Sequence, residues 1–212
     1  VGRKLKELTV GTDQRVLAPG NYGFWLNFFE PIPQIRGALY KSATHFWPEH
    51  IYYQITNGSD GRISLACLKI ANIGKLVYSG PGSAEPFKDY KVPEEKFRPY
   101  LKENLVENGD IYFSVPLAND SLAKVVNRAN LEKIKKPYNA IDEEPIFSYV
   151  NILEEKAANK LNVERISPSH LKISGEIGQG DAVLVQQTYD SGWNVKQRGW
   201  KVAKDPLGFT LL

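Results

Sequence analysis

The sequence contains little of what disulfide-bonded and most catalytic proteins depend on: one cysteine, three histidines and no methionine among 212 residues. A single cysteine excludes an internal disulfide bond. No window approaches the ~18 consecutive apolar residues of a membrane-spanning helix, and no secretory signal peptide opens the chain. Because the chain begins at Val1 and ends on the apolar stretch GFTLL, we expect it to be a soluble fragment of a longer protein.

Clustered charge is also scarce. The chain has 27 lysines and arginines against 24 acidic residues, a net charge of +3, and its only basic cluster is KIKK at 133–136. This distribution is a weak electrostatic footprint for nucleic acid, and no nucleic-acid-binding motif accompanies it, so we expect no nucleic-acid partner. With 42% hydrophobic residues, the composition is that of an ordinary folded protein.

Motifs for catalysis, metal binding and phosphate binding are absent as well. His45 and His50 flank the sequence FWPE, where Pro48 disfavours a regular helix that would bring both rings to one face. Cys67 lies in an apolar segment without an activating histidine beside it, and the chain has no nucleophile elbow or glycine-rich phosphate loop. We therefore predict no catalytic residue, no metal and no cofactor in this chain.

Residues 1–115 are predicted to form an α+β front part. The opening residues contain a short strand, either KELTVG or QRVLA, and residues 61–70 have the apolar spacing of a helix. The strand KLVYS follows that helix, and IYFSVPL from Ile111 onward alternates as a strand. Residues 21–53 hold many aromatic and proline residues and few clean alternations, so we predict a long ordered loop with short pieces of structure there.

Residues 116–212 are predicted to form an antiparallel β-sandwich, jelly-roll-like in architecture. The stretch EPIFSYVNILE and five or six later segments have strand-like composition, with glycine- and proline-containing turns between them. The segment TYDSGWNV is predicted to be a hairpin in which Tyr189 and Trp193 are cross-strand neighbours. The whole chain is thus expected to be an α+β protein, with a mixed α/β front part followed by this sandwich.

The strongest positive signal is aromatic. Aromatic side chains are dense between residues 21 and 54, interleaved with amides and charged residues. Aromatic faces with amides nearby suit sugar rings, and tryptophan and tyrosine also suit a protein interface or the water–lipid boundary. The alternative is that most of these rings fill the core beneath a long loop. The residues that we predict to bind a glycan or to form an interface are Tyr22, Trp25, Asn27, Trp47, Tyr52 and Tyr53.

Three stretches, taken in order, resemble one family. They are QRVLAPGNYGFWLNFFEPIPQIRGAL, LACLKIANIGKLVYS and AVLVQQTYDSGWNVKQRGWKVAKDPLGFTLL. Together they are similar to the soluble part of large polytopic membrane proteins of the glycosyltransferase-C type, including the 6-pyruvoyl-tetrahydropterin-synthase-related and YfhO-like membrane protein groups. The chain departs from the family pattern at Ser191, where proline is usual, at Asn72–Lys75, and at QRGWKV, which lacks the Asp-Gly of the family's hairpin.

The resemblance implies an extracytoplasmic domain that is anchored, in the full-length protein, by a bundle of membrane helices. In that family a lipid-linked sugar is the usual donor and the acidic catalytic residues belong to the helical part, so no catalytic residue carries over to this chain. The resemblance predicts a non-catalytic domain that binds a glycan or acceptor or braces the helical part. Its expected partners are the transmembrane part of the same polypeptide and a glycan or lipid-linked sugar. Two alternatives stay open: a stand-alone secreted carbohydrate-binding or adhesive β-protein, and a soluble enzyme whose site the sequence does not reveal.

Overall fold

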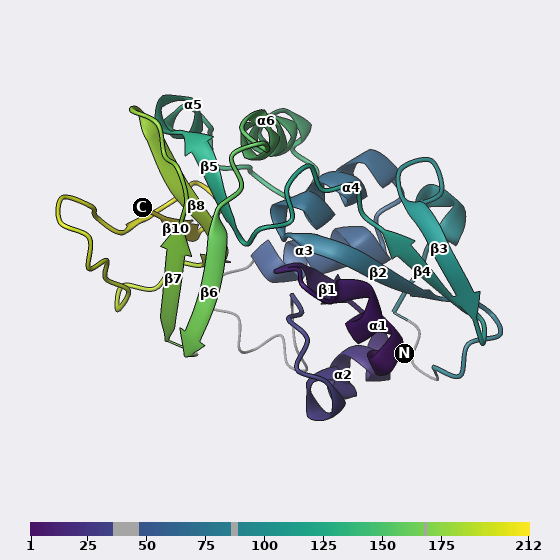
Figure 1. The fold of residues 1–212 in the computed structure, drawn as a ribbon. Coiled ribbons are helices and arrows are strands. Elements are labelled where there is room, and N and C mark those ends of the chain that lie inside the picture. The colour runs from purple at the N-terminus through teal and green to yellow at the C-terminus, as the bar shows by residue number, and fades with distance from the viewer. Residues whose placement is uncertain (36–46, 86–88, 168) are drawn as a thin grey trace. The chain divides into compact units, whose positions relative to one another are not determined.

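A computed structural model describes residues 1–35, 47–85, 89–167 and 169–212 of the chain (Figure 1). The chain is an α+β protein with mainly antiparallel sheets, and this prediction is confirmed. It divides into two compact units, unit 1 from Val1 to Leu117 and unit 2 from Ala118 to Leu212. The division falls close to the boundary expected after residue 115.

Unit 1 is built on a four-stranded sheet in the order β1-β2-β4-β3. Its strands are β1 (Arg15–Leu17), β2 (Ile73–Ser79), β3 (Lys102–Glu107) and β4 (Asp110–Ser114). β1 is parallel to β2, whereas β4 is antiparallel to both β2 and β3. β2 is buried along almost its whole length, which explains why its sequence, IGKLVYS, is largely apolar rather than alternating.

In its described residues, unit 1 has the α-helices α1 (Gly2–Thr9), α2 (Gly20–Phe29), α3 (Trp47–Thr56) and α4 (Gly61–Ile70), and a short 3-10 helix at Glu94–Lys96. α4 and β2 form the helix and strand that the sequence predicts in this order, and that prediction is confirmed. The short strand expected near the N-terminus is β1, within QRVLA. The other option, KELTVG, is wrong because most of it belongs to α1.

The core of unit 1 lies on both faces of its sheet. Leu5 of α1 and Leu26 of α2 are buried on one face. Val77 of β2 belongs to the cluster on that face. Because successive side chains of a strand point to opposite faces, the next residue, Tyr78, lies on the other face, where its ring packs with those of Tyr90 and Phe97. The cluster on the first face consists of Leu5, Val16, Ala18, Leu26, Ile32, Val77 and Tyr112.

The long loop predicted for residues 21–53 is wrong over most of the described part of that segment, although residues 30–35 do lie outside helices. Its first part is α2 and its last part lies in α3, while residues 36–46 lie outside the described residues. Glycine and aromatic residues have weak intrinsic helix preference, which makes the sequence GNYGFWLNFF read as irregular. Tertiary contacts, described below, override that preference.

Unit 2 contains a second four-stranded sheet, in the order β5-β8-β10-β9, and a two-stranded sheet of β6 and β7. The pairs between these strands are antiparallel. Val125 and Val183 of the larger sheet share a cluster with Val163 and Leu171 of the smaller one, and a complete jelly-roll sandwich stays a prediction. The strands are β5 (Ala123–Asn127), β6 (Asn162–Ser167), β7 (His170–Ser174), β8 (Asp181–Thr188), β9 (Ala203–Lys204) and β10 (Phe209–Leu211).

Two helices, α5 (Arg128–Glu132) and α6 (Glu143–Glu155), accompany the sheets of unit 2. The strand predicted at EPIFSYVNILE is wrong, because this stretch is most of α6. β-branched and aromatic residues gave it a strand-like composition, but its apolar positions recur at helical spacing. The buried residues that show this spacing are Ile146, Tyr149, Val150 and Leu153.

The hairpin predicted at TYDSGWNV does not form. The turn is present: Gly192 N–H donates to the Asp190 carboxylate at 2.7 Å, and Trp193 N–H donates to the Asp190 carbonyl at 3.1 Å. β8, however, pairs with β5 and β10, and Tyr189 N–H donates to the Gly208 carbonyl at 2.9 Å. Trp193 lies outside any strand and is partly buried, so its predicted cross-strand pairing with Tyr189 is wrong.

Candidate functional site

Helix α2 has no charged residue and no side chain that caps its own first turn. Two carboxylates from a distant part of the chain take this role. Asp89 accepts a hydrogen bond from Gly20 N–H at 2.5 Å, and Glu85 accepts one from Tyr22 N–H at 3.0 Å. Negative charge is favourable at a helix N-terminus because the first amides have no partner within the helix. The start of α2 is therefore fixed by tertiary contacts.

After its first turn, α2 is held by close packing at Gly23 and by the amide side chains of Gln34 and Asn27. A Cβ atom on Gly23 would lie 2.6 Å from the Ala18 carbonyl oxygen, so only glycine fits there. Gln34 donates through Nε2 to the Gly23 carbonyl at 3.0 Å and to Asn27 Oδ1 at 2.6 Å. Asn27 Nδ2 in turn donates to the Ile32 carbonyl at 2.6 Å. These bonds tie α2 to the segment that follows it.

The two sides of α2 differ sharply in exposure. Leu26 is only 3% exposed, whereas Phe24, Trp25, Phe28 and Phe29 are 49%, 51%, 77% and 71% exposed. Positions i, i+1, i+4 and i+5 share one side of a helix. α2 therefore presents a strip of exposed rings, which we call the aromatic face: Phe24, Trp25, Phe28 and Phe29.

The rings of the aromatic face contact one another edge to face. Their centroids are 5.3 Å apart for Phe24 and Trp25, 6.0 Å for Trp25 and Phe28, and 5.0 Å for Phe28 and Phe29. Favourable aromatic pairs have centroid separations of about 4.5–7 Å. The four rings therefore form one contiguous surface.

A groove of about 770 Å³ adjoins the aromatic face. Trp25 and Phe29 line it from α2, and Arg3 of α1 and Glu30 supply charged groups. Lys6 of α1 pairs with Glu30 at 2.7 Å. The groove and the aromatic face share Trp25 and Phe29, so they form one continuous apolar surface with charges at its edge.

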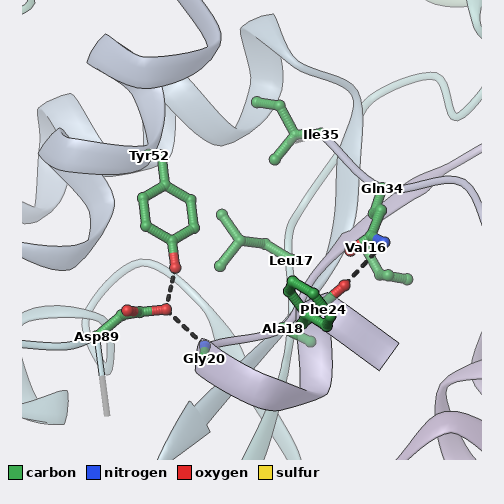
Figure 2. Close-up of a pocket in the computed structure, with 10 residues that line it drawn as sticks. Val16, Leu17, Ala18, Gly20, Phe24, Gln34, Ile35, Tyr52 and Asp89 are labelled. Atoms are coloured by element: carbon green, nitrogen blue, oxygen red, sulfur yellow. Dashed lines mark hydrogen bonds between the residues drawn. The ribbon is translucent and has the colours of Figure 1, made fainter. Parts of the chain in front are cut away.

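A smaller cavity of about 110 Å³ lies beside the first turn of α2 (Figure 2). Here the Tyr52 hydroxyl and the Gly20 N–H both donate to Asp89 Oδ2, and Leu17 and Ile35 add apolar walls. Small-molecule sites usually occupy about 300–1,000 Å³. This cavity is too small for such a ligand, and its polar groups hold α2 in place.

Three of the predicted ligand-binding residues lie on α2. Trp25 belongs to the aromatic face. Tyr22 is partly buried and lines the groove, and burial raises the pKa of its hydroxyl above the ordinary value. Asn27 is engaged through both its amide atoms with the segment after α2, so its described contacts are structural.

The other three predicted residues lie on α3 and do not form one surface. Trp47 is 6% exposed and its ring contacts that of His50. Tyr52 reaches the start of α2 through Asp89, and Tyr53 is exposed. The structure thus connects Tyr52 with α2 but places Trp47 in the core.

Sequence reasoning missed three residues of the aromatic face, Phe24, Phe28 and Phe29. A signal for them was present, because Phe24 and Phe28, and likewise Trp25 and Phe29, are four residues apart and lie one above the other on a helix. Only the helical spacing distinguishes this strip from an irregular aromatic loop.

Buried titratable groups elsewhere hold the fold together. Cys67 is 1% exposed, and burial raises the pKa of its thiol to about 12, which disfavours the thiolate needed for nucleophilic chemistry. Lys96 donates to three backbone carbonyls after the end of α3 and in its last turn. Among the described residues, no group of three or more His, Cys, Asp or Glu side chains is arranged to hold a metal ion, and His45 lies outside that part of the chain.

Comparison with known protein families, with curated proteins and with solved structures finds no match for this chain. Within the ranges that the structure describes, no helix has the length and apolar character needed to cross a membrane. The fold and the site together define an α+β protein of two units, in which one helix of unit 1 presents aromatic side chains to solvent.

Proposed function

We propose that this chain is a non-catalytic extracytoplasmic domain of a membrane-embedded, glycosyltransferase-like protein, and that α2 docks it onto the membrane-embedded part of the same polypeptide. The observation that carries the proposal is the aromatic face of α2, which stays exposed although the helix itself is firmly held. A rigid, exposed apolar strip is typical of a surface that meets a partner.

The size of the aromatic face supports this role. Aromatic side chains bury about 150–250 Å² each when enclosed, so the exposed fractions of these four rings correspond to roughly 400–600 Å². The largest apolar patch on a typical monomer is about 300–600 Å² and is often functional. A single helix of unit 1 therefore carries as much exposed apolar surface as the largest patch on most whole proteins.

The contacts of the buried charged groups support a non-catalytic role. Lys156 binds both carboxylate oxygens of Asp181 at 2.6 and 2.7 Å, which connects α6 to β8. Asp205 accepts hydrogen bonds from the amides of Leu207 and Phe209 and from the Tyr149 hydroxyl. Each of these groups stabilises a turn or a packing contact.

Glycan binding is the second candidate function, and the exposed indole of Trp25 favours it. Sugar recognition needs polar groups beside the stacking ring. The groove that Trp25 lines supplies Arg3 and Glu30, whereas the neighbouring phenylalanines supply none and the Asn27 amide is engaged. Glycan-array binding separates the two functions: binding that is lost in Trp25→Ala and kept in Tyr53→Ala would support a sugar site, and no binding by the parent chain would remove it.

The docking role is tested by photo-crosslinking. A photoreactive amino acid in place of Phe28 in the full-length protein, in native membranes, is expected to give adducts with membrane-embedded segments or with lipid. The matched control is the same amino acid at Val106, which is 53% exposed on β3. Equal adducts at both positions, or none at Phe28, would contradict docking through α2.

A further inference from the structure

We infer that the partner of the aromatic face is lipid, so that α2 lies at the boundary between headgroups and acyl chains with α1 beside it. This inference rests on the proposed position of α2 beside the membrane-embedded part, and it assigns the aromatic face itself to the lipid around that part rather than to its helices. A lipid surface is distinguished here from a second protein, a second copy of this chain and a glycan.

The composition of α2 suits a lipid boundary. A surface helix of a soluble protein has charged or polar residues on its outer side, but α2 has no charged residue along Gly20–Phe29 and carries phenylalanine there. Helices that lie in the membrane interface bury an apolar face at the headgroup–acyl boundary. α2 differs from them in that its opposite side packs on the core of unit 1 through Leu26 instead of facing water. Trp25 adds an indole, whose apolar ring and N–H suit the same boundary.

The charges beside the aromatic face suit anionic headgroups. α1 carries Arg3, Lys4 and Lys6 against a single acid, Glu7. Lys4 pairs with Glu7 and Lys6 pairs with Glu30, each at 2.7 Å, while Arg3 lines the groove beside the aromatic rings. Beyond the two ion pairs, Arg3 leaves one positive charge beside the apolar face, and a basic residue in that position favours anionic over neutral headgroups.

A second copy of the chain and a glycan fit this surface less well. The aromatic face alone offers roughly 400–600 Å² of apolar surface. A stable protein–protein interface buries about 800 Å² of polar and apolar surface on each partner, so a second copy would also have to cover polar surface around the rings. Three of its four rings are phenylalanines, which cannot hydrogen-bond to sugar hydroxyls. Lipid requires neither a minimum interface on a partner nor hydrogen bonds from the rings.

The test is co-sedimentation of the 212-residue chain with vesicles of phosphatidylcholine, with and without phosphatidylglycerol as the anionic lipid. The parent chain is expected to partition onto both, more strongly onto anionic vesicles. The double substitution Phe28→Ser/Phe29→Ser should lower partitioning about tenfold or more on either lipid. Arg3→Glu should lower it several-fold on anionic vesicles only.

Val106→Ser is the matched control, because it removes an exposed apolar side chain from β3. The Val106 side chain lies on the opposite face of β3 from Leu105, which packs on the cluster of Leu5 and Leu26, so the control substitution leaves that cluster unchanged. Circular dichroism must show the same fold for every variant. No partitioning by the parent chain, or equal losses in the Val106 and phenylalanine variants, would overturn the inference. Protein adducts at Phe28 without vesicle binding would also overturn it, yet leave the docking role intact.

Discussion

Substituting one residue on each side of α2 tests whether the helix has the buried and exposed faces on which its role depends. Leu26→Ala removes a side chain that is 3% exposed and packs in the core of unit 1. Truncating a buried leucine loses its transfer free energy and leaves a cavity, so the free energy of unfolding should fall by about 2–5 kcal/mol.

Phe28→Ser changes a larger side chain on the same helix but should cost about 1 kcal/mol or less. The ring is 77% exposed, so little apolar area returns to water on unfolding. Serine and phenylalanine have similar helix propensities, so the backbone term is small. What is lost is the edge contact with Trp25 and with Phe29, made largely at the surface.

Urea unfolding followed by far-UV circular dichroism, at several protein concentrations, measures both losses. We expect Leu26→Ala to shift the midpoint well below that of Phe28→Ser, with neither midpoint depending on concentration. A cost for Phe28→Ser as large as that for Leu26→Ala would refute the assignment of faces, because it would mean that the Phe28 ring is buried in solution.

Three further predictions concern polar contacts. Asp60 accepts hydrogen bonds from the Arg62 and Ile63 amides at the start of α4. Burial acts to raise the pKa of the Asp60 carboxyl, but the hydrogen bonds from these amides and the charge of Arg62 outweigh that effect and hold the pKa below 3.8. Asp60→Ala should therefore cost about 1 kcal/mol at neutral pH, and this difference should shrink as the pH falls from 3.8 through the lower pKa of the folded state, as measured by urea unfolding across pH. Lys96→Met should lower the free energy of unfolding by about 1–3 kcal/mol. Burial lowers the pKa of Lys96 from 10.5 to about 8, so between these two pH values the unfolded chain binds more protons than the folded one. In the same titration, the stability of the wild type relative to the variant should therefore increase as the pH rises from about 8 to 10.5. Thermal unfolding should show Lys156→Met to be more destabilising than Asp181→Asn, because the former leaves the nearly buried Asp181 carboxylate, 2% exposed, without its cation.

Sequence patterns are informative where local and tertiary preferences agree. At α4, apolar spacing, an Asp60 N-cap and a following buried strand all indicate the same structure, and the helix and strand were predictable. At α6, strand-like composition competes with helical spacing, and spacing decides the outcome because one face of the helix is buried. For α6, the spacing of apolar residues therefore predicts the secondary structure better than residue composition does.

The candidate site was only partly predictable, for a physical reason. α2 is held by Asp89 and Glu85, which are 69 and 63 residues away from the amides that they bind. No local sequence pattern indicates contacts at that separation. The sequence therefore favours a loop for the aromatic segment and does not distinguish its buried rings from its exposed ones. Trp25 was identified from its residue type, whereas Trp47 has the same type and is buried.

The most direct test of lipid docking through α2 is the fluorescence of Trp25 in a chain whose other three tryptophans are replaced by phenylalanine. Vesicles are made from brominated phosphatidylcholine, which quenches a nearby indole, and from the unbrominated lipid. If the aromatic face enters the lipid boundary, the emission of Trp25 should shift to shorter wavelength on unbrominated vesicles and be quenched on brominated ones. An emission spectrum that stays the same as in buffer on both vesicles would contradict the account.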